Sequence, residues 1–185
     1  MTDANRDILN RLILVQCRLG KTEGFETLVR TWQKPLLYYI RRLVEREEDV
    51  LDVMQDVWVR ALGGIRSLRS HEAMPTWLYR IAHNTAMSHL RKRGRWETNR
   101  EDIEVLDAVE VGADEAPQFA ASEIHEALSV LPLLEREVLT LHFLEGYEVT
   151  EIAEITEAPV GTVKSRMFRA KRNLRQVLEK GERLQ

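Results

Sequence analysis

The sequence predicts an all-α protein: two small helical domains joined by an acidic flexible linker, the C-terminal one a helix-turn-helix bundle. Apolar residues recur at spacings of three and four along most of the chain, which is the helical period. Nine glycines and five prolines among 185 residues leave few breaks, and period-two alternation is hard to find. From residue 101 to 115 the chain is acidic without one Lys or Arg, which is typical of a linker. We therefore expect domains over 1–95 and 121–185 and a linker over 96–120.

Several amphipathic helices are expected to form the core of the N-terminal domain. Pro35 is expected to break one apolar stretch into two helices, and Thr76 is expected to cap the last helix. The expected helices cover residues 5–19, 25–32, 36–43, 47–62 and 77–93, with glycines 20, 63 and 64 as stops and a polar loop over 65–75. The first helix is expected to bury Ile8, Leu12, Val15 and Leu19.

The helix over 47–62 has an unusual acidic side. Asp49, Asp52 and Asp56 are spaced three and four apart, which places them together on one exposed face. Such a face is either merely solvated or a docking surface for a basic partner. Acid–base catalysis is disfavoured, because these carboxylates lie on an open helix with no sign of a pocket.

The loop over 65–75 and the helix after it combine cations with aromatic and amide side chains. This combination is typical of a track for single-stranded nucleic acid, in which aromatic rings stack on bases. The basic end of the helix also complements the helix dipole, which is the simpler interpretation. Trp77 and Tyr79 could stack on bases, although core packing is favoured for Trp77. The candidates are Arg66, Arg69, Trp77, Arg80, Asn84, Arg91, Lys92, Arg93 and Arg95.

The most basic helix is expected near the C-terminus, starting at about residue 160. Val163, Met167 and Ala170 follow one apolar stripe, and Ser165 and Arg169 fall on the opposite side. A short amphipathic helix over 149–155 and a tight connection precede it, as in a helix-turn-helix whose second helix reads a DNA groove. Alone, the basic helix could equally be a solvated face. The side opposite the stripe also includes Arg172, and Thr162 or a neighbour is expected to cap the helix.

Two further helices are expected to complete the C-terminal bundle. Their apolar residues lie over 124–131 and 134–143, separated by Pro132 and closed by Gly146. Phe143 is counted with the buried side of the second helix. Four helices in about 60 residues leave a small core, as expected for a DNA-reading module.

Composition disfavours several other classes of protein. Cys17 is the one cysteine, so an internal disulfide is excluded, and a small, half-buried hydrophobe is expected rather than a redox sensor. The five histidines have no spacing that suits a metal, so no metal or cofactor is expected. No signal peptide and no apolar run long enough to span a bilayer are present, so a cytoplasmic protein without membrane contact is expected.

Two separate sets of motifs resemble the extracytoplasmic-function sigma factors of bacterial RNA polymerase, in the right order and over nearly the whole chain. The C-terminal set comprises Leu131-Pro132, Arg136-Glu137-Val138-Leu139, Glu145-Gly146, Glu151-Ile152-Ala153 and the segment 159–166. The N-terminal set comprises Gly20, the segment 25–29, Asp49-Val50, Gln55-Asp56, the segment 76–82 and Asn84-Thr85-Ala86. A helix-turn-helix alone would be far less specific.

The resemblance implies a subunit, not an enzyme, that binds core RNA polymerase and directs promoter-specific transcription initiation. The N-terminal domain would dock on the clamp helices of the β′ subunit through Asp49, Asp52, Gln55 and Asp56. Its loop would capture a base from the melted −10 element, assisted by the cationic, aromatic and amide candidates of the loop and the following helix. The C-terminal domain would read the −35 duplex. The linker would pass toward the RNA exit path. The β flap of polymerase and an anti-sigma factor are further implied partners. The implied −35 residues are Thr162, Lys164, Ser165, Arg166, Phe168, Arg169 and Arg172.

Two positions depart from the family pattern. The specificity loop reads Leu68-Arg69-Ser70-His71-Glu72-Ala73-Met74-Pro75 where many members carry Arg-Gly-Asp, so the identity of the captured base stays open. Glu157 stands where the turn of the helix-turn-helix often carries glycine, and a left-handed conformation there costs about 1 kcal/mol. The alternative function is a repressor or activator that binds DNA without polymerase, which the acidic face beside a basic track disfavours.

Overall fold

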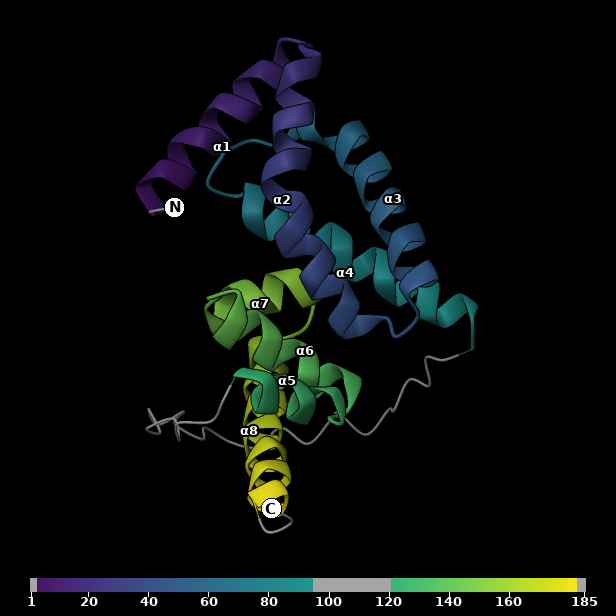
Figure 1. Ribbon diagram of the computed structural model, residues 1–185. Helices are drawn as coiled ribbons and strands as arrows, with labels where there is room; N and C mark the ends of the chain where they lie inside the picture. Colours follow the sequence, from purple (N-terminus) through teal and green to yellow (C-terminus); the bar gives the residue numbers. More distant parts are fainter. Residues whose placement is uncertain (1–2, 95–120, 183–185) are drawn as a thin grey trace. The chain divides into compact units, whose positions relative to one another are not determined.

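The computed structural model describes residues 3–94 and 121–182, and every regular element within these ranges is helical (Figure 1). The all-α prediction is therefore confirmed. The chain divides into two compact units, Met1–Glu97 and Thr98–Gln185. The expected linker over 96–120 lies outside the described residues.

Helix α2 is the centre of the first unit and packs against α1, α3 and α4 (Figure 1). Helices α3 and α4 also pack on each other, and α1 contacts the short 3₁₀ helix η1. Leu28, Leu36 and Ile40 of α2 are fully buried, as is Leu78 of α4. The elements are α1 (Asp3–Arg18), α2 (Thr22–Leu43), α3 (Glu47–Gly64), η1 (Ile65–Ser67) and α4 (Met74–Lys92).

Helix α2 continues through Pro35, so the predicted break is wrong. A proline inside a helix removes one backbone hydrogen bond and costs roughly 3 kcal/mol. The buried residues before and after Pro35 share one face of the helix, and that shared packing holds the two halves in line. Leu28 and Trp32 precede the proline on this face, and Leu36 and Ile40 follow it.

Helix α1 presents the opposite side to the core from the one predicted. The expected core stripe is exposed, whereas Ile13, Leu14 and Cys17 are buried. Asn10 lies on the buried side and accepts a hydrogen bond from the Trp32 indole at 3.2 Å. This helix is apolar on both sides, and periodicity alone does not say which side is covered. The exposed stripe is Ile8, Leu12, Val15 and Leu19, at 66, 50, 47 and 68%.

The segment between α3 and α4 is shorter than predicted. Gly63 and Gly64 form the end of α3, as predicted, although both are helical, and η1 follows at once. Helix α4 begins at Met74 with Pro75 in its first turn, so Thr76 lies inside the helix and is not its cap. The fully buried Met74 side chain anchors this start in the core.

The second unit is built around the long helix α8, which α5, α6 and α7 all contact. Pro132 precedes α6, and Gly146 adopts the left-handed conformation at φ 79° where the following segment turns. Phe143 is 58% exposed, so its predicted place in the core is wrong. The elements are α5 (Ala121–Ser129), α6 (Leu133–Leu139), the π-helical turn η2 (Thr140–Leu144), α7 (Val149–Thr156) and α8 (Val160–Glu182).

The turn between α7 and α8 is left-handed at Glu157, with φ 52° and ψ 35°, so this conformation forms although the residue is not glycine. The Ala158 N–H donates to the Ala153 carbonyl at 3.1 Å, a bond that satisfies one of the last carbonyls of α7. Helix α8 then begins at Val160, and the Val163 N–H donates to the Pro159 carbonyl. Thr162 is therefore inside the first turn of α8 and not its cap.

Candidate nucleic-acid and protein interfaces

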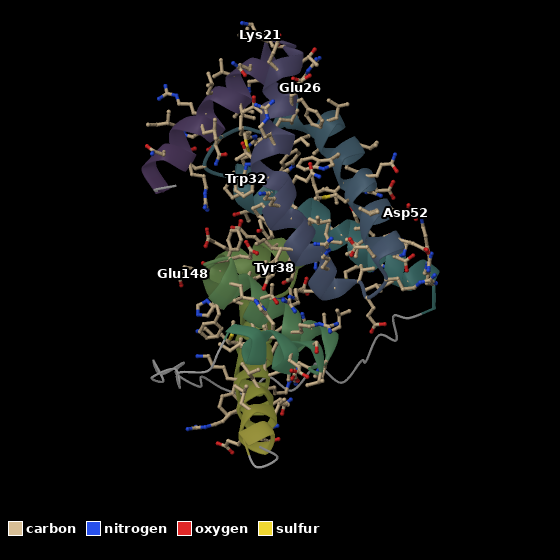
Figure 2. All side chains as sticks on the ribbon, in the orientation of Figure 1. Lys21, Glu26, Trp32, Tyr38, Asp52 and Glu148 are labelled. Carbon is tan, nitrogen blue, oxygen red and sulfur yellow. The ribbon has the colours of Figure 1, made fainter. Side chains whose placement is uncertain are left out.

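The outer side of α3 mixes acidic and apolar side chains. Asp52, Gln55 and Asp56 are exposed there, as predicted, and Asp52 points outward from the helix (Figure 2). The helical period places large apolar residues on the same side, including Leu51 and Val59, which are 57 and 66% exposed. Sequence analysis missed them, although their spacing of eight residues was a usable signal. An apolar strip with charged neighbours is typical of a protein-binding surface.

Asp49 is not part of this exposed side, which corrects the prediction. It is 1% exposed, and its carboxylate lies 2.7 Å from the Arg93 guanidinium and 3.6 Å from Nε2 of His89. Helical spacing places Asp49 near Asp52, but the last turn of α4 covers the first turn of α3. A buried carboxylate needs such partners because an unpaired buried charge is costly. Asp49 is therefore unavailable to a partner protein.

The side of α4 that faces away from the core carries several predicted nucleic-acid residues. Arg80 and Arg91 are exposed and Asn84 is half-buried, and their spacing places them on one side of the helix. Trp77 begins the same side and is half-buried; a Cβ added at Gly64 would lie 3.0 Å from its ring. Trp77 thus packs closely on the end of α3, as favoured from the sequence.

Two members of the predicted set differ from expectation. Tyr79 is 1% exposed and its ring centroid lies 5.1 Å from that of Tyr39, so stacking of Tyr79 on a base is wrong. The basic run at the end of α4 also splits: Lys92 is exposed with Arg91, whereas Arg93 turns to the buried Asp49. Arg95 lies outside the described residues.

The loop between η1 and α4 exposes Arg69, and Arg66 of η1 is exposed beside it. Ser70 donates its hydroxyl to the Glu72 carboxylate and accepts the Glu72 N–H at 3.2 Å. These contacts make a compact turn within a short loop, with its arginines directed to solvent. This part of the chain is thus compact and cationic.

Helix α8 presents a different exposed side from the one predicted. Lys164, Phe168 and Arg172 are exposed, whereas Ser165 is buried and donates its hydroxyl to the Thr162 carbonyl at 2.9 Å. Arg169 is turned toward α6, with its Nε 3.9 Å from Oε1 of Glu135. The side opposite the apolar stripe is therefore partly covered, which corrects the predicted positions of Ser165 and Arg169.

Contacts between α6 and α8 explain this rotation of the exposed side. Glu135 is 8% exposed and accepts a hydrogen bond from Asn173 Nδ2 at 2.7 Å, one turn after Arg169. Thr162 and Arg166 are half-buried. Sequence analysis missed Lys171, whose ammonium lies 5.4 Å from the Phe143 ring centroid. The continuation of the basic run after Arg169 was the signal for it.

Two electrostatic features lie outside these surfaces. Burial raises the pKa of the Cys17 thiol, and the positive charge of Arg66 offsets part of that rise. Cys17 is a small core residue, as predicted, but it is buried and not half-buried. Arg41, near the end of α2, donates to Glu47 at the start of α3, and this hydrogen bond lowers the pKa of the Glu47 carboxyl.

Within the described ranges, no cluster of three or more His, Cys, Asp or Glu side chains has a geometry suited to a metal ion. Among the described helices, none combines the length and apolar character that crossing a bilayer requires.

Family models match both units. The model for sigma-70 region 2 matches residues 28–95, and the model for sigma-70 region 4 matches residues 121–174. The first match contains α3 and α4 with the loop between them, and the second contains the helix-turn-helix.

Curated relatives extend the similarity over most of the chain. The RNA polymerase sigma-H factor of Pseudomonas aeruginosa is 34% identical over 86% of this chain and 89% of that protein. The ECF RNA polymerase sigma-E factor of Haemophilus influenzae is 35% identical over 89% of this chain and 92% of that protein.

Solved structures show the same fold. The sigma factor RpoE of Bartonella quintana, solved with the anti-sigma factor NepR, has a TM-score of 0.65 and 25% identity, covering 85% of this chain and 98% of that chain. CnrH, solved with the cytosolic domain of CnrY, has a TM-score of 0.66 over 93% of this chain and 98% of that chain; at 22% identity this supports the fold alone.

Proposed function

This chain belongs to the extracytoplasmic-function sigma factors, and we propose from that membership that it binds core RNA polymerase and directs it to particular promoters. The observation that carries the proposal is that one chain has three distinct exposed helix sides. Those of α4 and α8 are cationic, and that of α3 is acidic and apolar. The first two suit nucleic acid and the third suits a protein.

The α3 side formed by Leu51, Asp52, Gln55, Asp56 and Val59 is the proposed dock for the clamp helices of the β′ subunit. Its exposed apolar residues supply area to bury, and its carboxylates supply complementarity to a basic partner. Asp49 is not assigned a contact here, because it is buried against α4. The β flap is proposed as a second contact with polymerase, for which no residues are assigned.

The loop and the outer side of α4 are the proposed site for melted −10 DNA. Arg66 and Arg69 of the loop and Arg80 and Arg91 of α4 are exposed cations that can neutralise phosphates of a single strand. Asn84 lies between Arg80 and Arg91 on the same side, where an amide can hydrogen-bond a base edge. Capture of unstacked bases, and not a chemical step, would then favour opening of the duplex.

Helix α8 is the proposed reader of the −35 element. Lys164 and Arg172 are exposed on the side that also carries Phe168, which suits a major groove with phosphates on both rims. Arg169 is 26% exposed beside Glu135, so we assign it a shared role: it orients α8 on α6 and contacts DNA only with its exposed part.

An anti-sigma factor is the proposed regulator. The Bartonella quintana sigma factor of similar fold was solved in complex with one. A partner of this kind would compete with polymerase if it covered the exposed apolar side of α3. Competition between such a partner and core polymerase in a pull-down is the direct test.

Run-off transcription tests the main proposal. The purified chain, mixed with core polymerase and a library of genomic fragments, is expected to yield specific transcripts, and the chain alone is expected to bind duplex promoter poorly. A repressor would behave in the opposite way: it would bind a duplex operator without polymerase and leave a footprint with two-fold symmetry. That second pattern would refute the proposed function.

A further inference from the structure

The loop proposed to capture the −10 base is held in place by helix α1. The Arg18 side chain, in the last turn of α1, reaches across to the loop. Its Nη2 atom donates to the carbonyl of Leu68 at 2.6 Å and to the carbonyl of Arg69 at 3.1 Å. One guanidinium nitrogen thus bridges two consecutive peptide carbonyls, 50 and 51 residues further along the chain.

A second contact joins α1 to the same loop. Nε2 of His71 lies 3.3 Å from the carboxylate of Asp7 and 3.4 Å from that of Glu72. The His71 side chain is 20% exposed, so it is largely covered in this position. Asp7 and Arg18 therefore fix opposite parts of the loop to a single rigid helix.

The Arg18 contact is suited to positioning because it acts on the backbone. The Leu68 carbonyl directly follows η1, where helical carbonyls lose their partners within the chain. A charged donor makes a stronger hydrogen bond than a neutral one. Two such bonds to adjacent carbonyls fix the peptide planes on both sides of Cα of Arg69, and those planes decide where the Arg69 side chain points.

We propose that Arg18 is a positioning residue for −10 recognition: by bridging the Leu68 and Arg69 carbonyls it presets the loop that captures the base. The proposal rests on the proposed function of the loop. It extends that function to α1, which lies outside residues 28–95 matched by the region 2 model. A preset loop loses less conformational freedom on binding, so the correct base gains affinity relative to the others.

The test measures base preference and total binding separately. Holoenzyme is assembled from the full chain and core polymerase, then incubated with a pool of short single-stranded DNA whose centre is randomised. Sequencing the retained strands gives the preference at each position, and the retained fraction gives overall affinity. Arg18→Ala and Arg18→Lys are compared with wild type. Arg11→Ala, an exposed arginine two turns earlier on α1, controls for loss of charge.

The expected result is a preference reduced about tenfold at one position in both Arg18 variants, with total retention within about twofold of wild type. Arg18→Lys keeps the charge, but its ammonium does not extend as far along the side chain as Nη2 of arginine, so it should resemble Arg18→Ala. Arg11→Ala should match wild type in both measurements.

Three results would overturn the proposal. An unchanged preference in Arg18→Ala would show that the bridge does not preset the loop. A uniform loss of retention that Arg18→Lys restores would assign Arg18 to a phosphate. A lower melting temperature with preference intact would leave it a structural role only. Failure of the proposed function would look different. Wild type would then show no base preference, or Arg69→Ala would leave the preference unchanged. The Arg69→Ala variant removes the side chain but keeps the bridged carbonyl.

Discussion

The carboxylate of Asp49 lies 2.7 Å from the guanidinium of Arg93, and Asp49 is almost fully buried. This ion pair joins the first turn of α3, whose outer side is the proposed polymerase dock, to the end of α4, whose outer side is the proposed single-strand track. If the proposed dock is correct, Asp49 would contribute to it indirectly, because the ion pair links the two helices that carry these surfaces.

Replacing Asp49 should destabilise the first unit. Asp49→Ala leaves the Arg93 charge against a buried gap, and removal of one partner of a buried pair costs about 3 kcal/mol or more. Since Arg93 is 39% exposed and can turn to water, we expect a loss of about 2–3 kcal/mol. Urea unfolding followed by tryptophan fluorescence reports on this unit, because Trp32, Trp58 and Trp77 lie in its helices and residues 121–185 contain no tryptophan. Asp52→Ala is the matched control and should change stability by less than about 0.5 kcal/mol.

Charge reversal on the outer side of α3 should separate binding from folding. The double variant Asp52→Lys and Asp56→Lys is expected to abolish capture by core polymerase while the unfolding midpoint stays near that of wild type. The reason is that both carboxylates are exposed, so their loss removes complementarity without uncovering the core. Pull-down with core enzyme measures it, with Glu26→Lys on α2 as a charge-reversal control. Retained binding by the double variant would place the dock elsewhere.

Two arginines of α8 should respond differently to substitution. Arg172→Ala should weaken promoter binding by holoenzyme to a similar extent for all −35 sequences. It should also reduce by about 1 the slope of log binding constant against log salt concentration, as loss of one phosphate contact does. Arg169→Ala should weaken −35 binding by roughly 1–3 kcal/mol and also lower the stability of the second unit, because Glu135 loses a partner. Titrations at several salt concentrations and thermal unfolding distinguish the two. Equal stability of both variants would show that the Glu135 contact is unimportant.

Local patterns in the sequence predicted the helical fold well. The helix-turn-helix follows from short-range signals: an amphipathic stretch over 149–155, a tight connection, and an apolar stripe that starts at Val163. These features depend on residues close together in the chain, which is why the sequence contains them.

The errors share a different physical origin. Asp49, Ser165 and Arg169 were each placed on an exposed side by helical spacing, yet each is covered or paired. Spacing gives the direction of a side chain around its helix, but a neighbouring helix can cover one turn and leave the next turn open. The predicted burial of the apolar stripe from Ile8 to Leu19 is wrong for the same reason, since only tertiary packing decides which of two apolar sides is covered.

Glu157→Gly should stabilise the second unit. A side chain at φ 52° is strained by about 1 kcal/mol, and glycine removes that strain, although its greater freedom in the unfolded chain offsets part of the gain. We expect a net gain of up to about 0.5 kcal/mol, measured by circular dichroism during thermal unfolding. Glu154→Gly, an exposed position within α7, should instead lose up to about 1 kcal/mol. A loss for Glu157→Gly would mean that contacts of the Glu157 side chain outweigh the strain.

The Cys17 thiol should be unreactive in the folded protein and should make stability depend on alkaline pH. Burial raises the pKa of this thiol above its ordinary value of 9.0, despite the opposing charge of Arg66. The folded state therefore holds the proton more tightly than the unfolded state, so the stabilisation is fully present below pH 9.0 and is lost as pH rises toward the folded-state pKa. Unfolding by urea between pH 7 and 10 should show a smaller decline for Cys17→Ala than for wild type, after allowance for the cavity that alanine leaves. Labelling by a disulfide reagent at neutral pH should require unfolding; rapid labelling of the native protein would contradict the buried thiol.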